Sequence, residues 1–389
     1  MFPVLSAEEK EALLTRLTEE IIEPAELHEA VTEASNGTRV LSCYDGFEPS
    51  GRIHIAQGIV KAINTNRLLR SGVSCIFYVA DWYALLNNKC DADLTKIQVL
   101  GRYFIEVWRA SGMLGIAEPV RFDDGSEASV KFIWASDFIR ENSTHYWTKV
   151  MDISRRFNVP RIQRCSTIMG RTEGETQPIA QILYPAMQCA DVFELGIDLV
   201  EMGVDQRKVN TLARDYCDKV PALRADKPVI LLHHMLLGLV GGKMSKSIAG
   251  SAIYMDDPFE DIQQKVLAAD CPSPKELVEE DNNKNPILEY YQYVIFGALE
   301  QGLIRSLPSD INGLPIPHAS LTSAASTGGQ YESFEALEKA YMAEELTPDI
   351  LKTSLIHYLD DLISPIRTHF SSTEELRRLL ADVHALRGK

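Results

Sequence analysis

The stretch VLSCYDGFEPSGRIHIAQGIVKAINTNRLL, residues 40–69, decides how this sequence folds. Residues 40–44 are mostly apolar and predict a strand. A turn punctuated by glycine and proline follows at 46–57, and from 55 to 69 apolar side chains recur every three or four positions, as in an amphipathic helix. The stretch therefore predicts a strand whose carboxyl end leads directly into a helix.

The same alternation continues along the chain. Four further apolar runs predict strands at 75–80, 130–135, 199–203 and 229–233. The segments 97–113 and 179–195 between them have helical spacing. This order predicts an α/β fold with a parallel sheet covered by helices on both faces, in which ligands bind beyond the carboxyl ends of the strands.

The chain changes character after about residue 250. Residues 255–389 contain 23 acidic and 11 basic residues, which accounts for −12 of the formal net charge of −16. Apolar periodicities in this part are helical and cover 259–267, 287–299, 334–342, 350–366 and 374–386. Residues 304–330 are rich in proline, serine and glycine and predict a long loop.

These changes predict three parts. Residues 1–35 are expected to form a helical segment with one or two amphipathic helices. Residues 36–250 are expected to form the sheet-bearing domain, with an insertion around 90–175. Residues 251–389 are expected to form a helical domain.

Composition excludes several classes of protein. No stretch reaches the ~18 uninterrupted apolar residues of a membrane helix. The start of the sequence is acidic and lacks the pattern of a signal or transit peptide, so we expect a cytoplasmic protein. Seven cysteines without a C-x-x-C pair argue against a disulfide framework and against a structural metal site.

Two common nucleotide-binding signatures are absent from the sequence. No G-x-G-x-x-G follows a predicted strand, and residues 237–244 fail the P-loop pattern because Met244 stands where serine or threonine is required. A nucleotide site in this chain must be built in another way.

Two loops after predicted strands are candidates for binding phosphate. His54 stands at the start of a predicted helix, where free backbone N–H groups and the helix dipole favour an anion. The segment GGKMSKS, residues 241–247, follows the fifth predicted strand, and its two lysines can reach a polyphosphate. The alternatives are a surface histidine in an ordinary turn and a solvated lysine loop.

A polar stripe lies on the helix predicted at 179–195. Pro185 suits the first position of a helix, which would place Tyr184 at the helix start. At 100° per residue, Tyr184, Gln188 and Asp191 fall within a wedge of about 60°. This stripe is either a solvated face or, if buried, a set of groups that a ligand satisfies. The segment EMGVDQRK, residues 201–208, adds an amide and two cations at the end of the fourth strand.

Together these segments resemble the class I aminoacyl-tRNA synthetases, specifically the tyrosyl-tRNA synthetases of the archaeal and eukaryotic type. The resemblance covers about residues 41–366. The family's HIGH motif corresponds to residues 54–57, HIAQ, and its KMSKS motif is matched letter for letter at 243–247. The resemblance implies a Rossmann-like catalytic domain with a helical insertion, followed by an α-helical anticodon-binding domain.

The resemblance also implies a tyrosine pocket. Tyr44 and Asp191 match the pair that hydrogen-bonds the substrate phenol, and Gly46 matches the glycine beneath the substrate. The residues that match those holding its amino group are Tyr184, Gln188 and Gln206. Phenylalanine leaves the buried groups of such a site unpaired, a form of discrimination for which tyrosyl enzymes are themselves the standard example.

The reaction implied by the resemblance uses ATP. The tyrosine carboxylate attacks the α-phosphorus, pyrophosphate leaves with Mg²⁺, and tyrosine is then transferred to tRNA(Tyr). The residues expected in catalysis are His54, Gln57, Lys243 and Lys246. Those expected to bind ATP are Gly51, His54, Ala56, Gln57, Lys243, Met244, Ser245, Lys246 and Ser247.

An acidic chain must bind RNA through local basic patches. Residues 149–171 contain six basic residues and one acidic residue, and the alternative to an RNA contact is a solvated helix face. In the family this region builds a homodimer interface and leads towards the acceptor stem. The residues expected to contact tRNA are Arg155, Arg156, Arg164, Arg207 and Lys208.

The sequence leaves three other functions open. A tryptophanyl-tRNA synthetase shares the fold and the chemistry, but the pair Tyr44 and Asp191 argues against it. A small-molecule nucleotidylyltransferase has no use for the lysine loop together with a helical domain. A non-catalytic RNA-binding paralogue is suggested by Gln57 in place of the second histidine of the HIGH motif, whereas the lysine loop and the tyrosine pocket favour an active enzyme.

Overall fold

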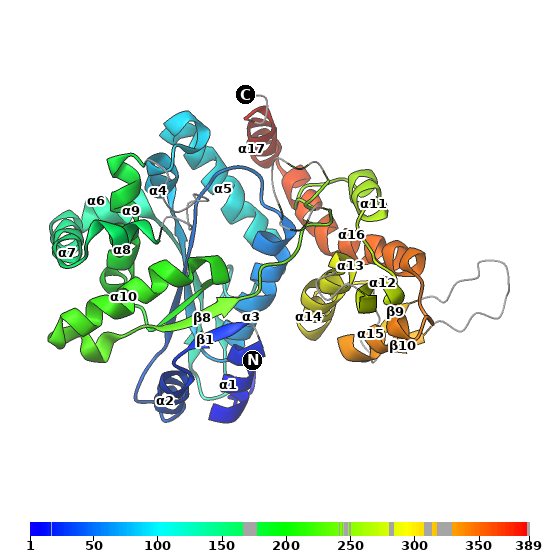
Figure 1. The fold of residues 1–389 in the computed structure, drawn as a ribbon, viewed down its shortest axis with the longest axis horizontal. Helices are drawn as coiled ribbons and strands as arrows, with labels where there is room; N and C mark the ends of the chain where they lie inside the picture. The colour runs from blue at the N-terminus through cyan, green and yellow to red at the C-terminus, as the bar shows by residue number, and fades with distance from the viewer. Residues whose placement is uncertain are drawn as a thin grey trace.

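A six-stranded sheet in the order β1-β8-β7-β2-β3-β6 forms the centre of the N-terminal part (Figure 1). The computed structural model describes residues 1–16, 18–165, 177–240, 242, 244, 248, 250–279, 284–306, 313–316 and 329–386. The strands are β1 (Glu20–Ile22), β2 (Ser42–Phe47), β3 (Ser74–Val79), β6 (Val130–Trp134), β7 (Leu199–Gly203) and β8 (Val229–His233). All five predicted strands lie in this sheet and run parallel, whereas β1, an antiparallel edge strand on β8, was not predicted.

Helices cover both faces of the sheet (Figure 1). Successive side chains of a strand point to opposite faces, and Cys43 and Tyr44 of β2 accordingly belong to two different buried apolar clusters. The cluster of Cys43 includes α3 and α5, and the cluster of Tyr44 includes α9 and α10. The helices of this part are α1 (Ala7–Arg16), α2 (Pro24–Ser35), η1 (Ala56–Val60), α3 (Lys61–Arg70), α4 (Asp81–Leu86), η2 (Lys89–Ala92), α5 (Leu94–Ala110), α6 (Ala135–Glu141), α7 (Ser143–Arg156), α8 (Val159–Gln163), α9 (Ile179–Glu194), η4 (Val204–Gln206), α10 (Arg207–Lys219) and η5 (Pro221–Asp226), beside a small hairpin of β4 (Val120–Arg121) and β5 (Glu127–Ala128).

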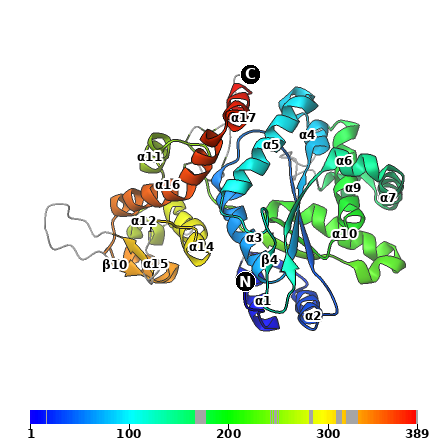
Figure 2. The same ribbon diagram turned by 180° about the vertical axis from the view of Figure 1, so that it is seen from behind.

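Helices also make up most of the C-terminal part. The predicted periodicities are confirmed as α11 (Phe259–Leu267), α15 (Phe334–Met342), α16 (Pro348–Ser372) and α17 (Glu374–Ala385), and the one at 287–299 as α13 (Pro286–Glu289), η6 (Tyr290–Ile295) and α14 (Phe296–Glu300); the short α12 (Pro274–Glu279) was not predicted. These helices share the buried cluster of α3 and α5, and Figure 2 shows α17 beside α5.

Two expectations about segments need correction. Residues 90–175 do not form one insertion outside the sheet, because they include β6, which pairs with β3; an inserted segment can begin only after β6, with α6 to α8. Residues 304–330 are not wholly a loop, because β9 (Leu314–Ile316) pairs with β10 (Gly329–Tyr331). The stretches 307–312 and 317–328 lie outside the described residues.

The cysteines behave as the composition suggests. All seven are free thiols, and five of them are buried. Within the described ranges, no helix is long and apolar enough to cross a membrane.

Candidate active site

A cavity of about 720 Å³ lies at the carboxyl ends of β2, β7 and β8. The chain continues from β2 to β3 on one side, whereas β7 lies on the other side of β2, and open α/β sheets bind ligands in the crevice at such a reversal of strand order. The cavity brings together predicted site residues from all four segments, namely Tyr44, Gly46, His54, Ala56, Gln57, Tyr184, Gln188, Gln206 and Met244. The described predicted residues that do not line it are Gly51, Arg155, Arg156, Arg164, Asp191, Arg207 and Lys208. The predictions for Lys243, Ser245, Lys246 and Ser247 fall outside the described residues.

One end of the cavity, the phenol end, is lined by Tyr44, Tyr83 and Tyr184. Behind it lies Asp191, which is 0% exposed. Its carboxylate accepts hydrogen bonds from the hydroxyls of Tyr83 at 2.5 Å, Tyr146 at 2.9 Å and Tyr44 at 3.5 Å. The hydroxyl of a fourth phenol, Tyr78, also acts on this carboxylate and favours its ionised form, so four phenols compete for its roughly four acceptor positions.

The charge state of Asp191 is set by two opposing effects. Burial raises its pKa to about 7, although hydrogen bonds from Tyr83 and Tyr146 favour the ionised carboxylate. Burial and the neighbouring carboxylate raise the pKa of Tyr44 well above its usual range, which keeps this phenol a hydrogen-bond donor. The phenol end therefore combines one carboxyl group, which accepts hydrogen bonds, with un-ionised phenols, which donate them.

The sequence did not point to Tyr83 or Tyr146. Tyr83 lies in α4, directly after β3, so its place beyond a strand end was a usable signal. Tyr146 comes from α7, where nothing in the local pattern distinguishes it from other core aromatics. Only the packing of α7 on α9 brings it to the carboxylate.

Helix α9 presents Tyr184 and Gln188 to the cavity. The amide Nε2 of Gln188 donates to Oε1 of Gln206 at 3.4 Å, which joins α9 to the turn after β7. The hydroxyl of Tyr184 donates to Oε1 of Glu48 at 2.5 Å, which joins α9 to the turn after β2. All three residues of the polar stripe are thus buried; Tyr184 and Gln188 face the cavity, and Asp191 lies behind it.

The prediction that Pro185 begins this helix is wrong. Helix α9 begins at Ile179, and Pro185 lies inside it. Ile182 and Leu183 of the earlier turns pack against the buried cluster of α9, and this packing compensates for the one backbone hydrogen bond that an internal proline removes.

The other end of the cavity, the turn end, is lined by residues of two loops: His54, Ala56, Gln57, Gly242 and Met244. The turn after β2 enters a π-helical turn, η1, before α3 begins. Its backbone pairs with residues 253–255: the N–H of Ile55 donates to the carbonyl of Ile253 at 2.8 Å, and that of Met255 to the carbonyl of Ile53 at 3.0 Å. The turn after β2 and the segment 253–255 are therefore joined by backbone hydrogen bonds.

A buried charged set lies between the two ends. Lys61 pairs with Asp45 at 2.5 Å and with Glu201, and Glu201 in turn contacts Nδ1 of His233 at 2.7 Å. Burial raises the pKa of Asp45 to about 6; burial acts on Glu201 in the same direction, but the charges of Lys61 and His233 outweigh it and lower the pKa of Glu201. Three members, Asp45, Lys61 and His233, line the cavity, and sequence reasoning missed all four.

The basic residues predicted on and after α7 differ in accessibility. Arg155 and Arg164 are exposed. Arg156 is partly buried, where its guanidinium pairs with Asp152 at 2.8 Å. Arg155 pairs with the same carboxylate at 2.6 Å, so the two arginines differ in exposure and not in partner, and Arg155 and Arg164 are the exposed cations of this set.

Arg207 and Lys208 begin α10 with exposed side chains. The guanidinium of Arg207 pairs with Glu20 of β1 at 2.9 Å. No group of three or more histidine, cysteine or acidic side chains suited to holding a metal ion occurs among the described residues.

Comparisons with known proteins identify the family to which the chain belongs. A model of the family described as tRNA synthetases class I (W and Y) matches residues 35–358. Two Arabidopsis thaliana proteins are similar: Tyrosine--tRNA ligase 2, cytoplasmic, is 41% identical over 383 residues, 98% of this chain and 46% of its own length, and Tyrosine--tRNA ligase 1, cytoplasmic, is 42% identical over 349 residues, 89% of this chain and 81% of its own.

Solved structures give the same answer. A Leishmania major tyrosyl-tRNA synthetase in complex with tyrosinol superposes with a TM-score of 0.83 at 40% identity and covers 99% of this chain, which spans 54% of that protein. The tyrosyl-tRNA synthetase of Aeropyrum pernix superposes with a TM-score of 0.78 at 27% identity, over 99% of this chain and 100% of that one. The chain spans about half the length of the first Arabidopsis relative and of the Leishmania protein. Because the family model matches most of the chain and the relatives have these identities, the chain belongs to the tyrosyl-tRNA synthetases, within the class I tRNA synthetases for tryptophan and tyrosine.

Proposed function

We propose that this chain activates L-tyrosine with ATP, giving tyrosyl-adenylate and pyrophosphate, and transfers tyrosine to tRNA(Tyr). The observation that carries the proposal is the buried carboxylate of Asp191 at the phenol end, which lies 3.5 Å from the hydroxyl of Tyr44, a residue that lines the cavity. The relatives' names and the Leishmania complex with tyrosinol, an analogue of tyrosine, support the same substrate.

The phenol end binds the side chain of tyrosine. The hydroxyl of the substrate donates a hydrogen bond to Asp191 and accepts one from Tyr44. Gly46 leaves space beside Tyr44, because an added Cβ at this position would lie 3.0 Å from the Tyr44 hydroxyl. The amino group is held by Tyr184, Gln188 and Gln206. Gln188 and Gln206 contact each other at 3.4 Å, and with the amino group bound there the carboxylate of tyrosine faces the turn end.

The turn end binds ATP, and the residues proposed for this are Gly51, His54, Ala56, Gln57, Lys243, Met244, Ser245, Lys246 and Ser247. The tyrosine carboxylate attacks the α-phosphorus in line, and pyrophosphate leaves as its Mg²⁺ complex. His54 and Gln57 donate hydrogen bonds to phosphate oxygens, and Lys243 and Lys246 neutralise the leaving pyrophosphate. The chain contributes position and charge; no covalent enzyme intermediate is needed.

We also propose that the chain binds tRNA(Tyr) and a second copy of itself, and that it works in the cytoplasm. Arg155, Arg164, Arg207 and Lys208 are exposed cations that suit the acceptor stem, with Arg156 bracing α7. Large apolar side chains are exposed on α7, α8 and α9, namely Met151 at 62%, Val159 at 53% and Ile179 at 84%, and a homodimer interface there would cover them. Both Arabidopsis relatives are named as cytoplasmic.

Amino-acid-dependent exchange of pyrophosphate into ATP tests the activity. The purified chain is expected to exchange with tyrosine and not with tryptophan, and then to charge tRNA(Tyr). Exchange with tryptophan alone would identify a tryptophanyl enzyme. Tyrosine binding without exchange would identify a non-catalytic relative, and exchange without charging of any tRNA would indicate a small-molecule nucleotidylyltransferase.

A further inference from the structure

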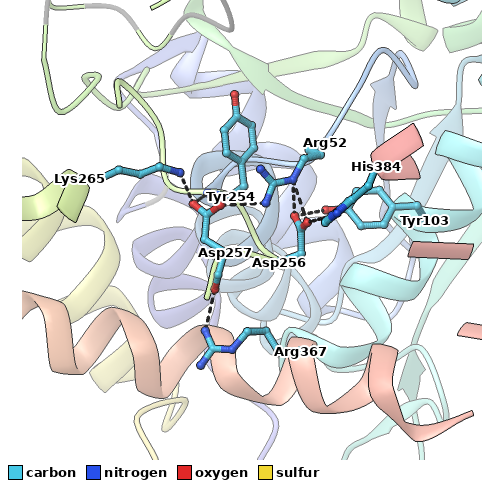
Figure 3. A network of polar contacts seen from close by, with 8 residues as sticks. All are labelled: Arg52, Tyr103, Tyr254, Asp256, Asp257, Lys265, Arg367 and His384. Carbon is cyan, nitrogen blue, oxygen red and sulfur yellow. Dashed lines mark hydrogen bonds and ion pairs between the residues drawn. The ribbon is translucent and has the colours of Figure 1, made fainter. Parts of the chain in front are cut away.

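A buried polar network joins the turn end of the cavity to the C-terminal helices (Figure 3). The eight side chains drawn are Arg52, Tyr103, Tyr254, Asp256, Asp257, Lys265, Arg367 and His384. Arg52 stands two residues before His54, and Asp256 directly follows the segment whose backbone pairs with the turn. None of these eight residues lines the cavity.

The centre of the network is one guanidinium held by two carboxylates. Nε of Arg52 donates to both oxygens of Asp256, at 2.7 and 2.9 Å, and Nη2 donates to Asp257 at 2.8 Å. The side chains of Arg52, Asp256 and Asp257 are 6%, 1% and 0% exposed. The guanidinium also lies 4.3 Å from the ring centre of Tyr254. Such a planar, buried arrangement fixes orientation as well as distance.

Helices from distant parts of the chain complete the network around Asp256. The hydroxyl of Tyr103, on α5, donates to one oxygen at 3.0 Å, and Nε2 of His384, on α17, contacts the other at 2.6 Å. Burial alone would raise the pKa of Asp256, but the hydrogen bonds and charge of Arg52, followed by those of His384, outweigh it and lower the pKa. Asp256 is therefore an anion that three segments share.

Asp257 ties in two more helices. Lys265 of α11 pairs with its carboxylate, and Arg367 of α16 donates to its backbone carbonyl at 2.9 Å. The segment that carries both aspartates is thereby fixed to the helical part of the molecule, while its preceding residues pair with the turn.

We propose that Arg52 and Asp256 are positioning residues for the nucleotide: they hold the turn of His54 in register with the segment after the lysine loop, and α17 contributes through His384. The proposal rests on the function proposed above. Because Tyr44, Tyr184 and Asp191 are held by other contacts on the opposite face of the sheet, disturbing the network changes the handling of ATP and leaves that of tyrosine unchanged.

The test compares two carboxylate-to-amide variants in tyrosine-dependent exchange. Asp256→Asn keeps the shape of the side chain but weakens its hold on Arg52. We expect the KM for ATP to rise about tenfold, as when a positioning element shifts by a fraction of an ångström, with the KM for tyrosine within about twofold of the unaltered chain. The matched control is Glu26→Gln, which breaks a bidentate pair with Arg214, at 2.7 and 2.8 Å, between α2 and α10, away from the cavity; it should change neither KM.

Two milder variants keep the test sharp if Asp256→Asn folds poorly. Tyr103→Phe removes only a hydroxyl, and His384→Gln removes only the imidazole of α17; each should raise the KM for ATP about two- to fivefold. Equal changes in the KM values for ATP and tyrosine, or the same behaviour in Glu26→Gln, would overturn the proposal.

Calorimetric titration with ATP gives the same comparison as a Kd, without turnover. A chain that fails to exchange with tyrosine yet shows weaker ATP binding in Asp256→Asn than in Glu26→Gln would refute the proposed function and support the positioning role. Equal ATP Kd values in the two variants would refute the positioning role whatever the activity.

Discussion

The two ends of the cavity are built in different ways. At the phenol end, Tyr44, Tyr83 and Asp191 are at most 2% exposed and are joined by direct side-chain hydrogen bonds within one face of the sheet. At the turn end, the elements that line the cavity are held by a backbone pairing and by a charged network that reaches into the C-terminal helices. Under the proposed function, recognition of the amino acid would depend on local contacts, whereas the shape of the nucleotide wall would depend on how distant segments pack.

This difference has a functional consequence. A rigid, enclosed acceptor distinguishes substrates by whether they carry a hydroxyl, because an unmatched buried group is costly. A wall assembled from separate segments depends instead on the contacts that hold those segments together, here the backbone pairing and the Arg52 network. Variants at the phenol end should therefore change the kinetic parameters for tyrosine, and variants at the turn end should change the KM for ATP or kcat.

The largest effect is expected at the phenol end. Asp191→Asn removes the charge and half of the acceptor capacity, so kcat/KM for tyrosine should fall on the order of 100- to 1,000-fold, while the KM for ATP stays the same. Asp198→Asn is the control, since Asp198 is a hydrogen-bonded carboxylate at the start of β7, away from the cavity. Similar losses in both variants would mean that Asp191 only supports the fold.

At the turn end, His54→Ala should act on turnover. Losing one donor to the transition-state phosphate is expected to lower kcat about 100-fold, with the KM for tyrosine unchanged. His28→Ala, an exposed histidine paired with Glu11 on the N-terminal helices, should have no effect. An increase in the KM for tyrosine in His54→Ala would contradict the separation of the two ends.

The two ends should also respond to pH in opposite directions. Burial raises the pKa of Asp191 from its ordinary value of 3.8 to about 7, so its contribution to stability is present below about pH 4 and is lost as pH rises through 7. Relative to Asp191→Asn, the unaltered chain should lose about 2 kcal/mol of unfolding free energy between pH 5 and pH 7, measured with urea.

Asp256 at the turn end shows the reverse. Its pKa is lowered, so its contribution to stability is present above the ordinary aspartate pKa of 3.8 and is lost as the pH falls below that value. The difference in unfolding free energy between the unaltered chain and Asp256→Asn should therefore stay constant from pH 5 to pH 7. If the difference in unfolding free energy between the unaltered chain and Asp191→Asn did not change from pH 5 to pH 7, the pKa of the Asp191 carboxyl would not be raised.

The smallest effect is expected outside the cavity. Reversing Arg155 and Arg164 to glutamate should raise the KM for tRNA about tenfold, more at low salt, and leave tyrosine-dependent exchange intact. Reversing Arg16 and Arg121, which are similarly exposed but lie on α1 and β4, is the control. Equal loss of exchange and charging would mean that Arg155 and Arg164 maintain the fold.

Much of the fold could be predicted because the sheet strands are continuous apolar runs of about five residues and the C-terminal helices have clear periodicity. The strand β1 was missed because it has three residues and forms only by pairing with β8. The start of α9 was misplaced because Pro185 is a local signal, whereas the earlier turns are stabilised by tertiary packing.

The candidate site was predictable only where it follows strand ends or a single helix face. Tyr44, His54, Gln188 and Gln206 satisfy one of these conditions, and all line the cavity. Tyr146 and the pairing of Arg52 could not be predicted, because Tyr146 lies 45 residues from Asp191 and Arg52 lies 204 and 205 residues from its two aspartates in sequence. Local pattern fixes which groups stand at the sheet edge, and tertiary packing decides what surrounds them.

The most direct test of the account is pyrophosphate exchange by the unaltered chain with tyrosine and with phenylalanine at equal concentrations. If the buried acceptor at the phenol end reads the hydroxyl, tyrosine supports exchange and phenylalanine gives none above background. Comparable rates with the two amino acids would contradict the account, because the two substrates differ only in the group that Asp191 and Tyr44 are proposed to bind.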